Sequence, residues 1–538
     1  MKKDNLVQRL SVAKRLFCSV AANQSTPTRE TMARETHLAY CVAIIGISLI
    51  LRLIFMGSNG LFVEEAYYWN YGEHLDFGYL DHPPMVGLLI KASVSLFGIH
   101  EFTVHLPALI CWVVTALFLF KLTELITRGA GQYAVMLFSV LPFFFMQSVV
   151  TTPDPPVMVC WSAALYYLYR ALVLDESRCW FIVGVWFGLG LLSKYTIVLL
   201  VLPVFFYMCI VPSARSWFTR KEPYLSALIA LLLFSPVIYW NATHEWVSFA
   251  FQTVHRFGTH SSFSLHKFIG LVLFVMTPVG FWQFGQLVLK KELTDARLDI
   301  KTERFLQLFT LIPIAFFGMY SLKYPVKFDW IGPGLLAILP WYAVLSLHAN
   351  QAGIRNPRRN WFITAAVCLF LYVGLLSVMT LGISETVQKK FLTRYFSWRD
   401  LTAEFYAVAR QMEVKTKAAP LFVPLDAYNI SSELSFYQAL LLAQGKIPRV
   451  YSVVGRHIFN CNSLMYKYWF NGENLSNKTL ILITTELDDF DILNVKAEVI
   501  DKSPLKVIWS HSQRGKGKIQ VFYYKIVQMK PYEELKFE

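Results

Sequence analysis

Residues 61–87 read LFVEEAYYWNYGEHLDFGYLDHPPMVG, a polar island between two apolar segments. The acidic pair Glu64-Glu65 opens the island, and Asp81-His82 lies near its end. Pro83-Pro84 follow at once, which stiffens the chain and restricts the residue before them. A loop that only crossed a surface would not need this density of carboxylates and rings. We therefore interpret residues 57–104 as an outer loop that carries a reaction centre.

The rest of the chain has the composition of a membrane protein. Of its 538 residues, 55% are hydrophobic and only 16% are charged. Apolar runs recur at the length of about 20 residues that a helix needs to cross a bilayer. We expect a polytopic α-helical membrane protein with about eleven transmembrane helices. They are expected at residues 37–56, 105–126, 131–150, 155–173, 180–193, 196–212, 224–240, 267–289, 305–322, 330–347 and 361–382.

Basic residues indicate the orientation of these helices. Residues 1–36 are rich in lysine and arginine, which predicts a cytoplasmic tail, and the later basic loops alternate onto the same side. The island then lies on the outer side, and Met85–Phe97 is expected to lie along the membrane as an interfacial helix. The formal net charge of +14 reflects this distribution rather than a nucleic-acid partner. The eight cysteines show no CxxC spacing, so neither a disulfide framework nor a zinc site is indicated.

The composition becomes mixed and polar after Gly382. Strand-like runs at 420–424, 480–484, 507–509 and 519–526 alternate with helical patterns at 401–412 and 432–443. Three parts are therefore expected: the tail 1–36, a transmembrane domain 37–382, and a soluble outer α/β domain 383–538.

The island supplies the first candidate catalytic residues. Glu64 could act as a general base, Glu65 could position it or bind an acceptor, and Asp81 with His82 could orient a phosphate. The flanking Tyr67, Tyr68, Trp69 and Tyr71 offer the stacking surfaces that sugars use. Ordinary alternatives are a solvated acidic pair in a first helical turn and a turn capped by Asp81. Glu64, Asp81 and His82 could also hold a divalent metal, although no spacing rule requires one.

Other outer segments supply candidate substrate-binding residues. Asp154 precedes a helix and could serve only as its cap, and Lys194 at a membrane boundary could bind a lipid phosphate or merely snorkel. The full set of outer candidates is Asp154, Lys194, Tyr195, Gln252, His255, Arg256, Lys323 and Lys327.

Taken in order, these motifs resemble a known superfamily. The acidic pair after the first helix precedes His-Pro-Pro at 82–84, Thr-Pro-Asp at 152–154 and Leu-Leu-Ser-Lys-Tyr-Thr at 191–196. This order is similar to bacterial membrane glycosyltransferases related to protein O-mannosyltransferases, and to the aminoarabinose and galacturonic acid transferases that modify lipid A and lipopolysaccharide core. The resemblance covers about residues 38–350. It implies the GT-C fold and a polyprenyl-phosphate sugar donor used on the outer face.

The resemblance also implies roles for single residues. Glu64 stands where the family usually has its catalytic aspartate, and Glu65 matches the glutamate that follows. Asp81-His82 stands where the aminoarabinose transferases carry Glu-Lys, and Lys194-Tyr195 matches a segment near the lipid phosphate. Asp329-Trp330 resembles an Asn-Trp pair, although the expected proline is absent.

We therefore expect an inverting glycosyltransferase in a bacterial inner membrane. It would move one sugar from a polyprenyl-phosphate donor to an outer-face hydroxyl, first on lipid A or lipopolysaccharide core and second on a protein. A flippase or transporter that binds the same lipid-linked sugar without cleaving it is the alternative. A third reading is a non-catalytic scaffold that recruits a partner through the C-terminal domain.

Overall fold

The computed structural model describes residues 29–255, 262–289, 298–348, 356–381, 397–470, 475–493, 499–501, 503–511 and 518–529. Most of the predicted tail, residues 1–36, lies outside these ranges. The first helix of the described part begins at Arg29.

Each predicted apolar run is helical over most of its described length. The long helices are α2 (Arg29–Ser58), α5 (Glu101–Ile126), α8 (Asp154–Leu172), α11 (Glu222–Thr243), α13 (Leu265–Leu289), α14 (Ile300–Tyr320) and α17 (Pro357–Leu381). Shorter or composite runs are α6 (Gly131–Val140) with α7 (Pro142–Gln147), α9 (Cys179–Leu191), η1 (Tyr195–Leu200) with α10 (Val201–Ile210), and α15 (Phe328–Ile331) with η4 (Pro333–Ile338) and α16 (Leu339–Leu347).

The described part of the structure contains fewer helices of membrane-spanning length than the apolar runs of the sequence predict. Among the described residues, five helices are long and apolar enough to cross a membrane. A sixth span results if the bent pair at residues 195–218 is counted as one. The expected number of about eleven spans is therefore not confirmed, although the class of polytopic α-helical membrane protein is.

Two of the predicted runs are interrupted by a proline. Leu141 separates α6 from α7 with an extended ψ of 137°, directly before Pro142. In α13 the break falls at Thr277, with φ 63° and ψ 164°, directly before Pro278. A proline ring disfavours the helical conformation of the residue before it, which accounts for the position of both breaks.

The C-terminal part is an α/β domain, as predicted. Helix α19 (Trp398–Thr416) precedes β1 (Leu421–Pro424), α20 (Asn429–Ala443) and β2 (Thr479–Thr484), and β1 and β2 pair in parallel. Parallel neighbours need a crossover connection, which the chain between them provides through α20. The long strand β5 (Lys518–Met529) pairs antiparallel with β2, β3 (Val499–Asp501) and β4 (Lys506–His511).

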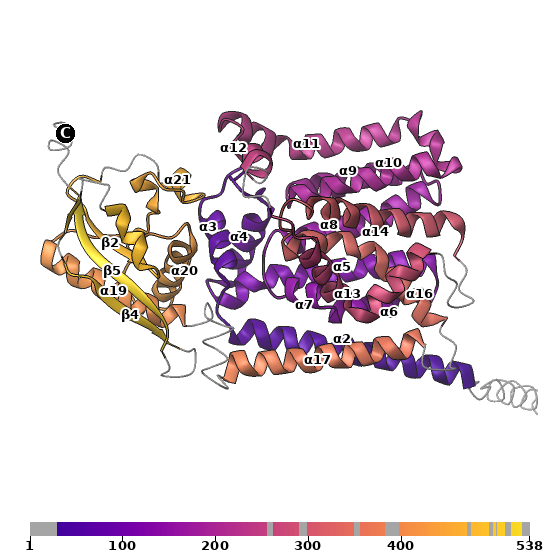
Figure 1. Ribbon diagram of the computed structural model, residues 1–538, viewed down its shortest axis with the longest axis horizontal. Helices are drawn as coiled ribbons and strands as arrows, with labels where there is room; N and C mark the ends of the chain where they lie inside the picture. The colour runs from indigo at the N-terminus through magenta and orange to yellow at the C-terminus, as the bar shows by residue number, and fades with distance from the viewer. Residues whose placement is uncertain are drawn as a thin grey trace, which may run out of the picture.

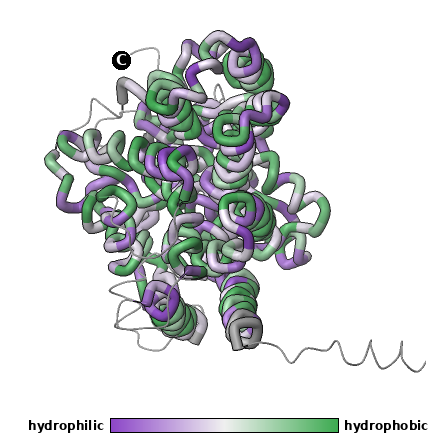
Figure 2. Tube along the Cα trace, turned by 90° about the vertical axis from the view of Figure 1, so that its right-hand side faces the viewer, coloured by the Kyte–Doolittle hydropathy of each residue, from purple (hydrophilic) through white to green (hydrophobic). Residues whose placement is uncertain are grey.

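The polar island lies between these two parts. It forms α3 (Val63–Glu73) and α4 (Met85–Phe97), which sit between the helical bundle and the C-terminal sheet domain in Figure 1. Helix α4 has the predicted bounds. Figure 2 looks onto the bundle and shows hydrophobic residues spread along its helices.

The island and the C-terminal domain share one hydrophobic core. Trp69 of α3 packs edge-on against Phe436 of α20 at 5.3 Å between ring centroids. The hydroxyl of Tyr437 accepts a hydrogen bond from the Leu61 backbone N–H at 3.2 Å. The C-terminal domain therefore holds the island in place.

Candidate active site

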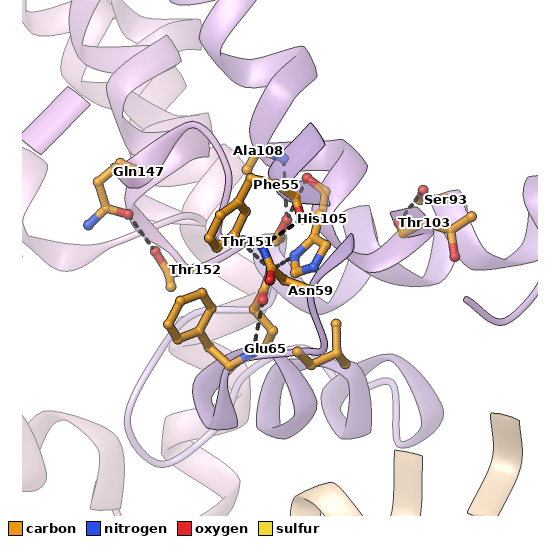
Figure 3. A network of polar contacts seen from close by, with 12 residues as sticks. Phe55, Asn59, Glu65, Ser93, Thr103, His105, Ala108, Gln147, Thr151 and Thr152 are labelled. Atoms are coloured by element: carbon orange, nitrogen blue, oxygen red, sulfur yellow. Dashed lines mark hydrogen bonds and ion pairs between the residues drawn. The ribbon is translucent and has the colours of Figure 1, made fainter. Parts of the chain in front are cut away.

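Adjacent carboxylates at the start of α3 have opposite environments. Glu65 is fully buried, and its Oε1 lies 2.8 Å from His105 Nδ1 and accepts a hydrogen bond from the Thr151 backbone N–H at 2.7 Å. Its Oε2 accepts from the backbone N–H of Phe62 at the helix N-terminus. Figure 3 shows His105 of α5 and Thr151 of the segment before α8 beside Glu65.

Glu64 faces the other way and is exposed. Within the described part of the chain, its carboxylate makes no hydrogen bond or ion pair. A carboxylate of this kind can accept a proton, whereas Glu65 is occupied in holding α3 against the bundle. We therefore propose that Glu65 positions Glu64 and does not contact the acceptor.

Asp81 is held by the aromatic residues of α3. Its Oδ1 accepts hydrogen bonds from the hydroxyls of Tyr67, at 3.0 Å, and Tyr71. Burial, together with the charge of Asp81, raises the pKa of both tyrosines, so they stay protonated and donate. The expectation that Tyr67, Trp69 and Tyr71 offer stacking surfaces for a sugar is wrong, because all three are buried in protein contacts.

Lys194, between α9 and η1, is the centre of a buried ion cluster. Its Nζ donates to both carboxylate oxygens of Asp154, at 2.9 and 3.0 Å, and to Asp329 Oδ2 at 2.8 Å. Burial opposes the charged lysine, but the two carboxylates outweigh it and raise the pKa of Lys194. An ammonium group has three donors, and these contacts use them. In this arrangement a substrate phosphate cannot reach Lys194 without displacing Asp329.

One cavity of about 1300 Å³ brings the candidate groups together. Glu64, Asp81, His82, Asp154, Lys194 and Lys327 all line it, as does Asp329. Of these, Glu64 and Lys327 are exposed to solvent, and Lys327 is the predicted outer lysine that can offer a positive charge to an anion.

Other predicted residues are not part of the cavity wall. Tyr195 contacts Ser248 at 2.9 Å between their hydroxyl oxygens, and Gln252 donates to the backbone oxygen of Asp81. The backbone oxygen of Lys323 accepts a hydrogen bond from Ser262, and its side chain is exposed. The His255 side chain and Arg256 lie outside the described residues.

The structure does not support the possible metal site at Glu64, Asp81 and His82. In the described ranges, no three His, Cys, Asp or Glu side chains are grouped closely enough to hold a metal ion. The physical reason is that two tyrosine hydroxyls already occupy Asp81 Oδ1, while Glu64 points to solvent.

Sequence reasoning missed the part of the cavity that the C-terminal domain supplies. Tyr428, His457, Cys461, Lys467 and Tyr468 line it from the segments around α20, η5 (Arg456–Phe459) and α21 (Tyr466–Trp469). Lys467 is exposed and is a second exposed lysine, after Lys327, in the lining of this cavity. The only signal in the sequence is the mixture of basic and aromatic residues at 456–470, which no spacing rule distinguishes from an ordinary loop.

Glu433 of α20 is a second buried carboxylate behind α3. It is fully buried, and neither of its carboxylate oxygens has a hydrogen-bond partner in the described structure. Burial, together with the nearby Glu65, Glu64 and Glu101, raises the pKa of Glu433 well above its usual value. The folded protein therefore favours the protonated acid at the contact between α20 and α3.

We expect Glu433→Gln to gain stability over the wild type as the pH rises. The folded-state pKa is raised, so the wild type is most stable below the unfolded pKa of about 4.3 and loses stability as pH rises toward the folded pKa. Glutamine does not titrate. Thermal unfolding at pH 5 and pH 8 should give a larger Tm advantage for Glu433→Gln at pH 8. Glu404→Gln, at an exposed position of α19, is the control without such a trend. If the Tm difference between Glu433→Gln and the wild type is the same at pH 5 and pH 8, the folded protein does not favour a protonated Glu433.

Comparison with known proteins agrees with this architecture. A family model described as dolichyl-phosphate-mannose-protein mannosyltransferase matches residues 81–240. The lipid A galacturonosyltransferase RgtD of Rhizobium johnstonii is 24% identical over 209 residues, 38% of this chain and 43% of that relative. The lipopolysaccharide core galacturonosyltransferase RgtA of the same organism is 23% identical over 350 residues, 61% of this chain and 69% of that relative. The match to RgtD thus spans less than half of its length.

The fold is also similar to that of a solved structure. ArnT of Cupriavidus metallidurans, in its structure bound to undecaprenyl phosphate, aligns with 91% of this chain and 98% of its own. The TM-score is 0.57 and the identity 14%, so this likeness concerns the fold. The chain is therefore a multi-pass membrane protein with the GT-C fold. The family model and the two relatives are all described as sugar transferases, and this chain is similar to each of them over part of its length.

Proposed function

We propose that the protein transfers a single sugar from a polyprenyl-phosphate donor to a hydroxyl of lipid A or lipopolysaccharide core. The observation that carries the proposal is the Glu64 carboxylate on the wall of the 1300 Å³ cavity, which makes no hydrogen bond or ion pair with any described residue. A carboxylate without such a partner can take a proton from an acceptor hydroxyl. The similarity to lipid A and core galacturonosyltransferases supports an outer-membrane glycolipid as acceptor and a uronic acid as the sugar.

In the proposed reaction, the acceptor oxygen forms a bond to the anomeric carbon as the bond from that carbon to the phosphate oxygen breaks. Glu64 receives the hydroxyl proton, and the bonding electrons leave with the polyprenyl phosphate. This direct displacement inverts the configuration of the anomeric carbon. Negative charge grows on the leaving phosphate, and Lys327 and Lys467 are the exposed lysines of the cavity that can offset it. Glu65 and Asp81 hold α3 and the loop after it, so Glu64 keeps its place.

The proposed location is a bacterial inner membrane, with the N-terminus in the cytoplasm and the C-terminal domain in the periplasm. The charge distribution along the sequence supports this orientation, because basic loops favour the cytoplasmic side. The donor and the acceptor would then meet in the cavity between the bundle and the periplasmic domain.

The test is mass spectrometry of lipid A and core oligosaccharide from a deletion strain and from the complemented strain. We expect one sugar mass to disappear on deletion and to return with the wild-type gene. Purified protein, given a polyprenyl-phosphate uronic acid and lipid A, should release polyprenyl phosphate. Sugar transfer to a protein instead of the glycolipid would show that the acceptor is a protein. Donor binding without release of polyprenyl phosphate would reject transfer and favour a transporter.

A further inference from the structure

A second cavity lies at the far end of the bundle from the C-terminal domain. Helices α2 and α17 run side by side along the lower edge of the bundle in Figure 1, and residues 37–40 of α2 and 358–366 of α17 line a cavity of about 560 Å³. Its described lining includes His37 and Tyr40 of α2 and Arg358, Arg359 and Phe362 of α17. None of the described lining residues is acidic.

The basic groups of this cavity are held by neighbouring elements. Arg358 donates to the backbone oxygens of Ser346 and Leu347 at the end of α16, at 2.7 and 2.6 Å. Those contacts fix its guanidinium beside His37. Arg359, one residue on, has an exposed side chain. The result is a fixed positive charge with a second arginine at the mouth, which is complementary to an anion.

One side of this cavity is apolar. That side is formed by Phe362, Ile363 and Ala366 of α17, and the centroid of the Phe362 ring lies 6.1 Å from that of His37 and 5.8 Å from that of Tyr40. The outward faces of both helices continue this surface, with Val42 59% and Phe370 76% exposed. In a membrane-spanning helix, such a face contacts acyl chains.

We propose that this cavity binds the phosphodiester headgroup of an anionic glycerophospholipid. Arg359 and His37 contact the phosphate, and Arg358 adds a fixed positive charge close to it. One acyl chain lies along Ile363 and Ala366 toward Phe370. Basic pockets between transmembrane helices bind anionic headgroups in this way. On the orientation proposed above, the lipid belongs to the cytoplasmic leaflet. This site is separate from the candidate active site, so the proposal does not depend on the proposed reaction.

Native mass spectrometry of the delipidated full-length protein tests the proposal. Dioleoyl-phosphatidylglycerol is the probe, dioleoyl-phosphatidylcholine has the same chains without net charge, and glycerol 3-phosphate has a phosphate without chains. We expect the wild type to retain phosphatidylglycerol in preference to phosphatidylcholine, and free glycerol 3-phosphate not to compete. Equal retention of both lipids would overturn the site, and competition by glycerol 3-phosphate would make it a site for soluble phosphates.

Two variants change the two halves of the site separately. Arg359→Gln should lower phosphatidylglycerol retention about fivefold, as expected for one basic contact near a membrane surface. Ala366→Phe fills the apolar half at an exposed position and should lower retention of the lipid without changing the charge. Arg178→Gln, an exposed arginine outside this cavity, is the matched control. Retention in Arg359→Gln and Ala366→Phe equal to the control would refute the proposal.

Discussion

Replacing Glu64 by glutamine is expected to lower sugar transfer by about 10²–10⁴-fold while leaving the fold intact, because the variant loses the general base and nothing else. The side chain is exposed, and its carboxylate makes no hydrogen bond or ion pair in the described structure, so the amide analogue breaks no such interaction there. The measurement is the rate at which purified full-length protein releases polyprenyl phosphate. Thermal unfolding of the same sample should give the wild-type Tm.

Two further variants make this result specific. Glu73→Gln removes another carboxylate of α3, one paired with Lys91 at 3.0 Å, and should keep nearly full activity. Glu64→Asp keeps the carboxylate with one methylene less, so part of the turnover should remain. If Glu64→Gln turns over as fast as the wild type, Glu64 is not the base, and the proposed reaction needs another proton acceptor.

The elements of the fold were predictable because each has a local signature. Apolar runs of membrane length became helices, and Met85–Phe97 was recognised with its observed bounds. The number of spans was not predictable in the same way. Residues such as Pro142 and Pro278 interrupt a run locally, and hydropathy does not record whether the pieces on either side cross the membrane together.

The candidate site shows where a single sequence stops being informative. Glu64 and Glu65 are adjacent and chemically alike, and only packing against His105 and Thr151 decides which one is buried. Those partners lie 40 and 86 residues further along the chain. Lys467 joins the cavity from a separate domain. Contacts over such distances leave no periodic pattern in the sequence.

The ion cluster around Lys194 provides the second large expected effect. Lys194→Gln should destabilise the protein by about 3–5 kcal/mol, because it leaves the buried Asp154 carboxylate without its cation. Thermal or denaturant unfolding measures this loss. Lys323→Gln, an exposed outer lysine beyond the cavity wall, should change stability by no more than about 0.5 kcal/mol. Wild-type stability of Lys194→Gln would mean that the buried ion pair does not form.

A double variant separates the structural role of the cluster from its role in the reaction. Lys194→Gln with Asp154→Asn removes the cation and the buried anion together, so most of the lost stability should return. Asp329 is then free of its partner at the cavity wall, and its side chain, 35% exposed, can be hydrated. We expect this folded double variant to remain inactive, because its unneutralised carboxylate repels the phosphate of the donor. Full activity in the double variant would show that the cluster only supports the fold, and that Lys327 and Lys467 suffice to bind the donor phosphate.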